Sequence, residues 1–453
     1  MAKVKSIYFC KECGGEHAKW QGKCNFCGSW NTLSEHKVQN TKSKASSASQ
    51  ILSQNTAQKL EEIPNADLER ISVEDEEFAR VMGGGIVPGS LILIGGEPGI
   101  GKSTLLLQLA LSLKKKVLYV SGEESLGQIK IRAERLGLSY NNAYFLDSHD
   151  SQHVLEQCKL LNAEILIIDS IQTMASQEID GIQGSIGQIR QCTTEFQQLA
   201  KSNDIPVFLI GHINKEGNLA GPKILEHMVD VVLQFEGDAQ NQYRLLRTIK
   251  NRFGSTSELG IYDMKMQGLS PVYNPSQAFL EHRCENDSGI AVAIGLEGIR
   301  PIMIETQALV SPAVYGNPQR SSNGFDLRRL NMHLAVLEKR CGLKLGNKDV
   351  YLNITGGIKL KDPAIDLATV CAIISSYMDQ VIPSKSCFAA EVGLSGEIRP
   401  IAQIDLRIKE AEKMGFERLF ISSAQQFSKG LSHQLKLIPC ARLQDVAPKL
   451  FKL

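Results

Sequence analysis

The sequence predicts an α/β protein whose core is a parallel β-sheet covered by helices on both faces. Four runs, at 91–94, 117–120, 165–168 and 205–210, are apolar almost throughout, as strands buried on both faces are. The first run leads through a glycine-rich loop into an apolar helix over 104–113. A cysteine-rich segment precedes this core, and a region of mixed strands and helices follows it, which indicates further domains.

Length and composition are those of an ordinary globular protein. The chain has 453 residues, 43% hydrophobic and 22% charged, and this length suits about three domains. It has no apolar run of about 18 residues and no apolar stretch typical of a secretory signal at its N-terminus. We therefore expect a cytoplasmic protein that does not enter a membrane. The net charge of +1 neither favours nor excludes a nucleic acid as partner.

Four of the eleven cysteines form the pattern C-x2-C-x10-C-x2-C near the N-terminus. They are Cys10, Cys13, Cys24 and Cys27, and each C-x2-C pair lets two thiolates approach one tetrahedral ion. Four protein ligands leave no open position, so we predict a structural zinc site. A redox-active dithiol is the alternative, although no adjacent strand–helix–strand pattern supports it. We expect His17 at the surface rather than as a ligand.

The stretch GEPGIGKST has the form of a phosphate-binding loop, G-x4-G-K-[ST], between a strand and a helix. In such a loop the backbone amides and the helix dipole hold phosphates. Lys102 would reach the β and γ oxygens, and Ser103 would ligate Mg²⁺. We therefore predict a site for ATP and Mg²⁺ made by Gly96, Glu97, Pro98, Gly99, Ile100, Gly101, Lys102, Ser103 and Thr104.

Acidic residues follow two of the other apolar runs. Asp169 comes directly after 165–168, and an aspartate at the end of such a strand holds Mg²⁺ through water. Glu123 and Glu124 follow 117–120, where a carboxylate can orient and deprotonate the attacking water. We favour Glu123 for this role. The alternative is that the two acids only begin a helix.

Two stretches that contain glycine, 172–190 and 214–230, follow strands and have no regular pattern. Loops carried by a rigid sheet are frequent binding sites. Arg190, Lys215 and Lys223 are candidate phosphate contacts in these loops. Loops that only connect elements are the alternative.

A cationic stretch ends the predicted strand 243–249. Lys250, Asn251 and Arg252 follow this strand, and Gly254 closes it as a turn. On these residues alone, a solvated strand end is as good an interpretation as a functional one.

These motifs, in this order, resemble those of the bacterial RadA family, RecA-type ATPases of DNA repair. The cysteine knuckle, the GEPGIGKST loop, the acid pair at 123 and 124 and the KNRFG stretch carry the resemblance, which covers essentially the whole chain. It implies a RecA-like core, ATP hydrolysis, a homohexameric ring, binding to single-stranded and branched DNA, cooperation with RecA, and branch migration. It also implies that Lys250 and Arg252 act catalytically on the γ-phosphate bound to the next subunit.

The C-terminal third is similar to the proteolytic domain of Lon. The nucleophile loop of Lon matches residues 361–366, where this chain has Lys-Asp-Pro-Ala-Ile-Asp and no serine. The catalytic lysine of Lon falls near 404–406, and Asp405 stands there. Without a nucleophile and its base, acyl-enzyme chemistry has no route, so we expect a pseudo-protease used in ring assembly or duplex DNA contact. Candidate DNA contacts, or else solvated surface residues, are Arg320, Arg328 and Arg329.

Four segments follow from these features: a zinc finger at 1–36, a flexible linker at 37–60, a RecA-like ATPase domain at 61–275 and a Lon-like domain at 276–453. The linker is predicted from its abundant Ser, Lys, Gln and Asn. The leading hypothesis is an ATP-driven DNA motor of recombinational repair. The alternative is a regulatory ATPase that acts on protein partners. An active ATP-dependent protease is disfavoured because the serine and the lysine are missing.

Overall fold

The computed structural model divides the chain into two compact units. The first comprises Met1–Phe235, Ile249–Gly254 and Met266–Leu269, and the second comprises Glu236–Thr248, Ser255–Lys265 and Ser270–Leu453. The structure describes residues 6–10, 16–17, 19–25, 28, 30–37, 59, 69–138, 142–211, 224–237, 243–281, 283, 286–313, 318–355, 360–428 and 433–451. The division into four segments stays a prediction.

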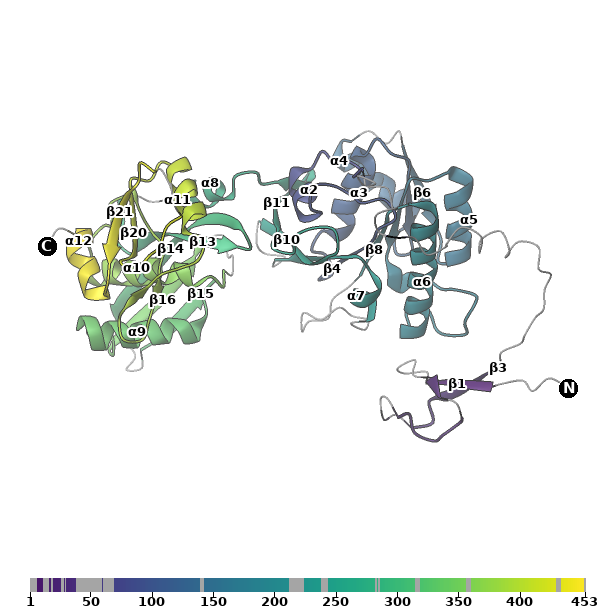
Figure 1. Ribbon diagram of the computed structural model, residues 1–453, viewed down its shortest axis with the longest axis horizontal. Coiled ribbons are helices and arrows are strands. Elements are labelled where there is room, and N and C mark those ends of the chain that lie inside the picture. Colours follow the sequence, from purple (N-terminus) through teal and green to yellow (C-terminus); the bar gives the residue numbers. More distant parts are fainter. Residues whose placement is uncertain are drawn as a thin grey trace. The chain divides into compact units, whose positions relative to one another are not determined.

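Parallel strands form the centre of the first unit (Figure 1). They are β4 (Leu91–Gly96), β5 (Val117–Ser121), β6 (Ala143–Asp147), β7 (Ile165–Asp169), β8 (Val207–Ile210) and β9 (Val231–Glu236), in the spatial order β9-β4-β8-β7-β5-β6. Every residue of β4, β5, β7 and β8 is buried, as expected of strands covered on both faces. The predicted α/β class with a parallel sheet is confirmed.

Helices cover both faces of this sheet. They are α2 (Glu76–Val81), α3 (Lys102–Ser112), α4 (Leu126–Leu136), α5 (Ser151–Leu161), α6 (Ile186–Asn203) and α7 (Ile224–Met228), with a 3-10 turn η2 (Ile171–Thr173). Val154 of α5 and Phe196 of α6 share one apolar cluster with Leu118 of β5. Helices α3 and α4 lie on the opposite face (Figure 1). Helix α3 begins two residues before the predicted 104–113, directly after the phosphate-binding loop.

The N-terminal segment forms a three-stranded antiparallel sheet. Its strands are β1 (Ser6–Cys10), β2 (Glu16–His17) and β3 (Leu33–Lys37), in the order β2-β1-β3. The predicted linker lies outside the described residues except for Lys37 and Lys59.

The second unit is built on a mixed seven-stranded sheet. In spatial order the strands are β15 (Arg320–Asn323), β16 (Lys348–Ile354), β14 (Arg300–Pro312), β13 (Ile290–Glu297), β17 (Ser386–Phe388), β20 (Arg418–Ser422) and β21 (Lys436–Cys440). Three further strands are β10 (Tyr243–Asn251), which ends in the first unit, β11 (Leu259–Lys265), and β12 (Gly268–Pro271), which begins in the first unit. The other elements are the pair β18 (Glu391–Val392) and β19 (Ile398–Arg399), the helices α8 (Pro275–Leu280), α9 (Leu327–Cys341), α10 (Asp366–Met378), α11 (Ile404–Lys413) and α12 (Val446–Phe451), and the 3-10 turns η4 (Pro363–Ile365) and η5 (Leu443–Asp445).

Helices cover the seven-stranded sheet on both faces as well. Apolar residues of α9, α10 and α12 form one cluster with β14 and β16, and α11 contributes to a separate cluster with Val292, Ile294 and Met303. Among the described residues, no helix is long and apolar enough to cross a membrane.

An ion pair with a buried arginine joins the residue before η4 to α11. Arg407 is 2% exposed, and its guanidinium lies 2.7 Å from the Asp362 carboxylate. Asp362 also accepts hydrogen bonds from the amides of Leu296 (2.6 Å) and Ala364 (3.1 Å), and Arg407 donates to the carbonyl of Ile294 (2.5 Å). Because both partners have further hydrogen bonds, the pair holds β13, η4 and α11 together.

We expect Arg407→Met to lower the stability of the second unit by about 3–5 kcal/mol, because the variant leaves Asp362 buried without its cation. Calorimetry of the full chain would measure this as a lower unfolding temperature. Lys385→Met is the matched control, since it breaks the exposed pair with Glu417 and should cost under about 1 kcal/mol. Equal shifts in the two variants would contradict the structural role of Arg407.

Candidate functional site

The phosphate-binding loop leaves the carboxyl end of β4 and enters α3. Gly99 (φ 76°) and Gly101 (φ 118°) have left-handed backbone conformations that favour glycine, and Gly101 directly precedes the helix. No side-chain hydrogen bond caps the first turn of α3. The amides of this turn and the positive end of the helix dipole are therefore suited to a phosphate.

Lys102 is the first residue of α3 and is 4% exposed. Its ammonium donates hydrogen bonds to the carbonyl oxygens of Gly96 (2.7 Å) and Glu97 (2.9 Å). Burial lowers the pKa of Lys102 to about 8, although the carboxylates of Asp169 and Glu123 act in the opposite direction. A bound phosphate would supply the negative charge that this buried ammonium needs.

Asp169 ends β7 beside the start of α3. It is 6% exposed and accepts side-chain hydrogen bonds from Tyr119 (2.6 Å) and from Ser103. Burial raises the pKa of Asp169, and these hydrogen bonds lower it in part. The Ser103 hydroxyl and the Asp169 carboxylate thus lie together, and both are oxygen ligands of the kind that Mg²⁺ prefers.

The two acids after β5 have different surroundings. Glu124 forms an ion pair with Arg132 of α4. Glu123 accepts a hydrogen bond from the Ser170 hydroxyl at 2.6 Å and lies close enough to Lys102 to affect its pKa. The structure therefore brings Glu123, rather than Glu124, to the phosphate-binding loop. Helix α4 begins later, at Leu126, so neither acid is in its first turn.

Three of the predicted site residues, Lys102, Glu123 and Asp169, are thus brought together at one edge of the sheet. Sequence reasoning missed Tyr119 and Ser170, which hold the two carboxylates. The sequence could have identified Ser170 as a site residue, because it directly follows Asp169. It could not have identified Tyr119, because a tyrosine inside an apolar strand is most simply a core residue.

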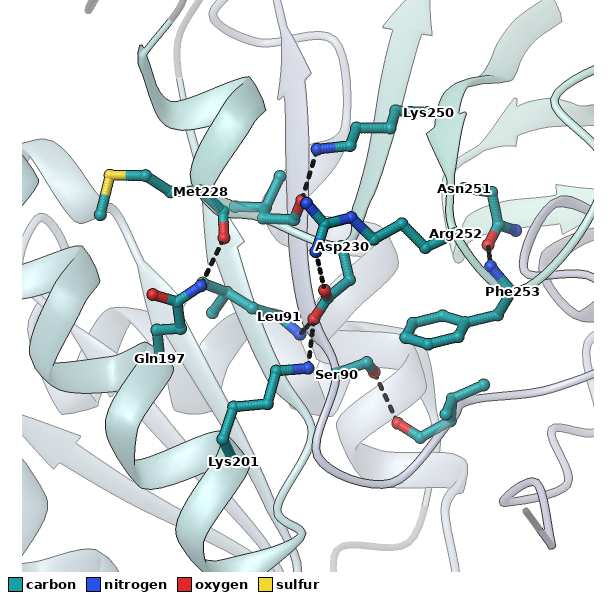
Figure 2. Close-up of polar contacts among 12 residues, drawn as sticks. Ser90, Leu91, Gln197, Lys201, Met228, Asp230, Lys250, Asn251, Arg252 and Phe253 are labelled. Atoms are coloured by element: carbon teal, nitrogen blue, oxygen red, sulfur yellow. Dashed lines mark hydrogen bonds and ion pairs between the residues drawn. The ribbon is translucent and has the colours of Figure 1, made fainter. Parts of the chain in front are cut away.

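Asp230 connects the cationic turn to Leu91, at the amino end of β4 (Figure 2). Strand β10 continues to Asn251, two residues past its predicted end. Lys250 donates to the carbonyl oxygens of Glu226 (2.6 Å) and Val229 (2.8 Å), and the Arg252 guanidinium lies 3.2 Å from the Asp230 carboxylate. Sequence reasoning missed Asp230, although it directly precedes an apolar strand.

The strand register fixes where this turn lies. Asp230 precedes β9, and Val231 of β9 pairs with Ile92 near the amino end of β4. The phosphate-binding loop begins at the carboxyl end of the same strand, at Gly96. Five residue steps along a parallel strand span roughly 16 Å. Lys250 and Arg252 therefore lie at the edge of the sheet opposite the phosphate-binding loop of their own chain.

Comparison with known proteins identifies the family. The chain is 46% identical over 430 residues to the DNA repair protein RadA of Bacillus subtilis (strain 168), with 94% of each chain covered. It is 49% identical to that of Streptococcus pyogenes serotype M1 (93% of each) and 44% identical to that of Halalkalibacterium halodurans (98% of each). This chain belongs to the RadA family of DNA repair proteins.

Two domain families also match. The AAA domain matches residues 56–218, and a rubredoxin metal binding domain matches residues 8–35. With RadA membership, they establish an ATPase domain of a DNA repair protein and a metal-binding ribbon. Among solved structures, the RadB recombinase is 21% identical, with a TM-score of 0.37 over 45% of this chain and 99% of that chain, which is too weak a likeness to build on.

The RadA metal-binding ribbon is partly described. The Gly28 amide donates to the Cys24 carbonyl at 2.9 Å, and Gly28 has φ 77°. The Cys24 side chain is 1% exposed. These features fit a thiolate site for a tetrahedral metal. Cys13 and Cys27 lie outside the described residues, and of Cys10 only the backbone is described, at the end of β1.

The expectation for His17 is wrong. His17 is 7% exposed rather than at the surface, and its Nε2 lies 3.4 Å from the Cys24 sulfur. Its Nδ1 lies 2.5 Å from the Gln21 side chain. Because β2 pairs with β1, this histidine packs beside the turn that carries Cys24.

The predicted loops of this RadA protein are described only in part. Stretch 172–190 contains η2 and, after the Ser185 cap, the first residues of α6, with Arg190 exposed on that helix. In stretch 214–230, residues 224–228 form α7, and Lys215 and Lys223 lie outside the described residues.

In the region predicted to be Lon-like, Ala364 is buried in η4 and Asp405 lies in the first turn of α11. Of the three candidate DNA-contacting arginines, Arg329 forms an ion pair with Asp366 (2.8 Å), Arg320 donates to Asn331 (3.3 Å), and Arg328 is exposed. Arg328 is therefore the one of the three with the most accessible side chain.

We expect the affinity for ATP to fall as the pH rises through about 8. The pKa of Lys102 is about 8 without nucleotide, and bound phosphates favour its charged form, so binding takes up a proton above that pH. Titration with a fluorescent ATP analogue and Mg²⁺ should show a roughly tenfold weaker affinity at pH 9 than at pH 7. Lys102→Arg stays charged and should lose this dependence. An equal pH dependence in the variant would assign it to another group.

Proposed function

We propose that this chain is an ATP-driven DNA motor of recombinational repair. It hydrolyses ATP, translocates on single-stranded DNA and promotes branch migration of intermediates made by RecA. The observation that carries this proposal is the pair of opposite edges on one sheet: a phosphate-binding site at one edge and a cationic turn at the other. In a ring of such units, the turn of one subunit can meet the nucleotide of the next.

At the phosphate edge, each residue has a separate task. The loop residues 96–101 and the first amides of α3 bind the phosphates, and Lys102 neutralises the β and γ oxygens. Ser103 and Asp169 would hold Mg²⁺, which when bound offsets the charge that develops on those oxygens. Glu123, oriented by Ser170 at 2.6 Å, would accept the proton of the attacking water.

At the other edge, Lys250 and Arg252 would act on the γ-phosphate bound to the neighbouring subunit. Their positions about one strand length from the loop of their own chain support an action between subunits. Charge that develops in the transition state is then neutralised only after assembly, as with an arginine finger. A homohexamer suits this arrangement, and rotation of its subunits would move DNA-contacting loops along a strand.

The remaining parts have supporting roles in this proposal. Cys10, Cys13, Cys24 and Cys27 would hold one Zn²⁺ that folds the ribbon without taking part in catalysis. The Lon-like part would serve ring assembly or duplex DNA contact and not proteolysis. The absence of a serine at 361–366 and the aspartate at position 405 support this.

Steady-state ATP hydrolysis with and without single-stranded DNA tests the motor proposal. We expect DNA to increase kcat severalfold, because productive contacts between subunits form on the strand. Lys102→Ala should show no hydrolysis above background in either condition. Hydrolysis by the wild-type chain that is indifferent to DNA would favour a regulatory ATPase for protein partners.

Arg252→Ala tests the action between subunits. We expect ATP binding to stay within about twofold of wild type, because Arg252 lies away from its own nucleotide site, while kcat falls by about 10³. Equilibrium nucleotide titration and DNA-stimulated turnover measure the two effects. Lys385→Ala, which removes an exposed cation of the second unit, is the control and should leave kcat unchanged. Full turnover by Arg252→Ala would rule out the finger role.

A further inference from the structure

Asp230 is a buried carboxylate at the start of β9 that the proposed chemistry does not use. Its side chain is 3% exposed and contacts groups from three separate parts of the chain (Figure 2). One oxygen accepts from the Leu91 amide at 3.0 Å and from the Lys201 ammonium at 2.8 Å. The other oxygen lies 3.2 Å from the guanidinium of Arg252. A carboxylate buried this far is costly unless such partners compensate it.

The short segment 226–230 holds both cations of the turn. Lys250 donates to the carbonyl oxygens of Glu226 and Val229, and the backbone amide of Arg252 donates to the carbonyl of Asp230 at 3.2 Å. The backbone and the side chain of Asp230 therefore both contact Arg252. These two contacts fix the point from which the Arg252 side chain extends into solvent.

The contact leaves most of the guanidinium available. The Arg252 side chain is 56% exposed, and one of its guanidinium nitrogens, Nη1, faces Asp230. A guanidinium has five N–H donors in a rigid fork, so one contact orients the group without using its capacity to bind a phosphate.

Lys201 is a second cation that contacts the Asp230 carboxylate. Lys201 lies near the end of α6 and is 48% exposed, and its ammonium shares the Asp230 carboxylate with Arg252. One carboxylate therefore faces two cations, so it does not neutralise Arg252 fully. Lys201 also provides a matched control, because it contacts the same carboxylate but is not part of the turn.

We propose that Asp230 is a positioning residue for Arg252. It orients the guanidinium, at the amino end of the strands in one subunit, toward the γ-phosphate bound to the next subunit. This inference rests on the proposed action of Arg252 between subunits. Asp230 itself would touch neither nucleotide nor DNA.

Asp230→Asn tests the proposal, since it keeps the shape of the side chain and removes the charge. We expect DNA-stimulated kcat to fall roughly tenfold or more, with the KM for ATP and the melting temperature close to wild type. Lys201→Met should keep kcat within about twofold, because the contact between Asp230 and Arg252 remains. Equal losses in Asp230→Asn and Lys201→Met would overturn the proposal, because general support of the site would then explain both. If Asp230→Asn melts early, its turnover is compared with wild type at a temperature where the variant remains folded.

Mixed rings separate positioning in the neighbour's site from an effect within the same subunit. Asp230→Asn subunits keep their own phosphate-binding loop, and Lys102→Ala subunits keep their turn. A mixture should therefore hydrolyse ATP faster than either variant alone, because Lys102→Ala subunits offer a well-oriented Arg252 to their neighbours. Arg252→Ala mixed with Lys102→Ala is the reference, and it should recover in the same way.

The outcomes of the mixing experiment are distinguishable. Recovery with Arg252→Ala but not with Asp230→Asn overturns the role of Asp230 and leaves the proposed function intact. No recovery with Arg252→Ala overturns the action between subunits and the inference with it. Recovery in both mixtures, with an unaltered Lys201→Met, supports the assignment.

Discussion

The common direction of the strands in the first unit determines what each end of the sheet can do. Strands β4, β5 and β7 run the same way, so Gly96, Ser121 and Asp169 end at one edge. The phosphate-binding loop, Glu123 and Asp169 gather at this edge because each follows its own strand. Groups that precede the strands, such as Asp230, lie at the opposite edge. One chain therefore carries, at opposite edges of the sheet, the two groups that the proposed catalysis between subunits requires.

The sequence predicted the strands of this edge well and their side-chain partners poorly. Strands β4, β5 and β7 begin at the predicted residues 91, 117 and 165 and end within two residues of the predicted ends. Buried parallel strands are continuous apolar runs, and the motif residues directly follow them, so local pattern is sufficient. The bond between Tyr119 and Asp169 joins residues 50 positions apart. Such a pair forms only between neighbouring strands, and no local run of the sequence encodes the strand order β9-β4-β8-β7-β5-β6.

In the second unit, the stretch predicted to correspond to the nucleophile loop of Lon packs into the fold. Asp362 in this stretch accepts from Leu296 and Ala364 and pairs with Arg407. These contacts hold elements of the fold together. The stretch thus serves as a structural junction, and the pseudo-protease interpretation stays a prediction. The sequence does not single out Arg407, because its burial depends on the sheet beneath it.

The two arginine–aspartate pairs of this chain show how the same chemistry gives two different roles. Arg407 is 2% exposed and lies 2.7 Å from its carboxylate, and it also donates to a backbone carbonyl. The N–H donors of Arg407 bind groups inside the protein, so Arg407 contributes to stability. Arg252 is 56% exposed and lies 3.2 Å from Asp230, which it shares with Lys201. Compensating a buried aspartate does not use all the donors of such an exposed arginine. The exposure of Arg252 is what the proposed contact with a neighbouring subunit requires, and the buried carboxylate beside it would orient the guanidinium for that contact.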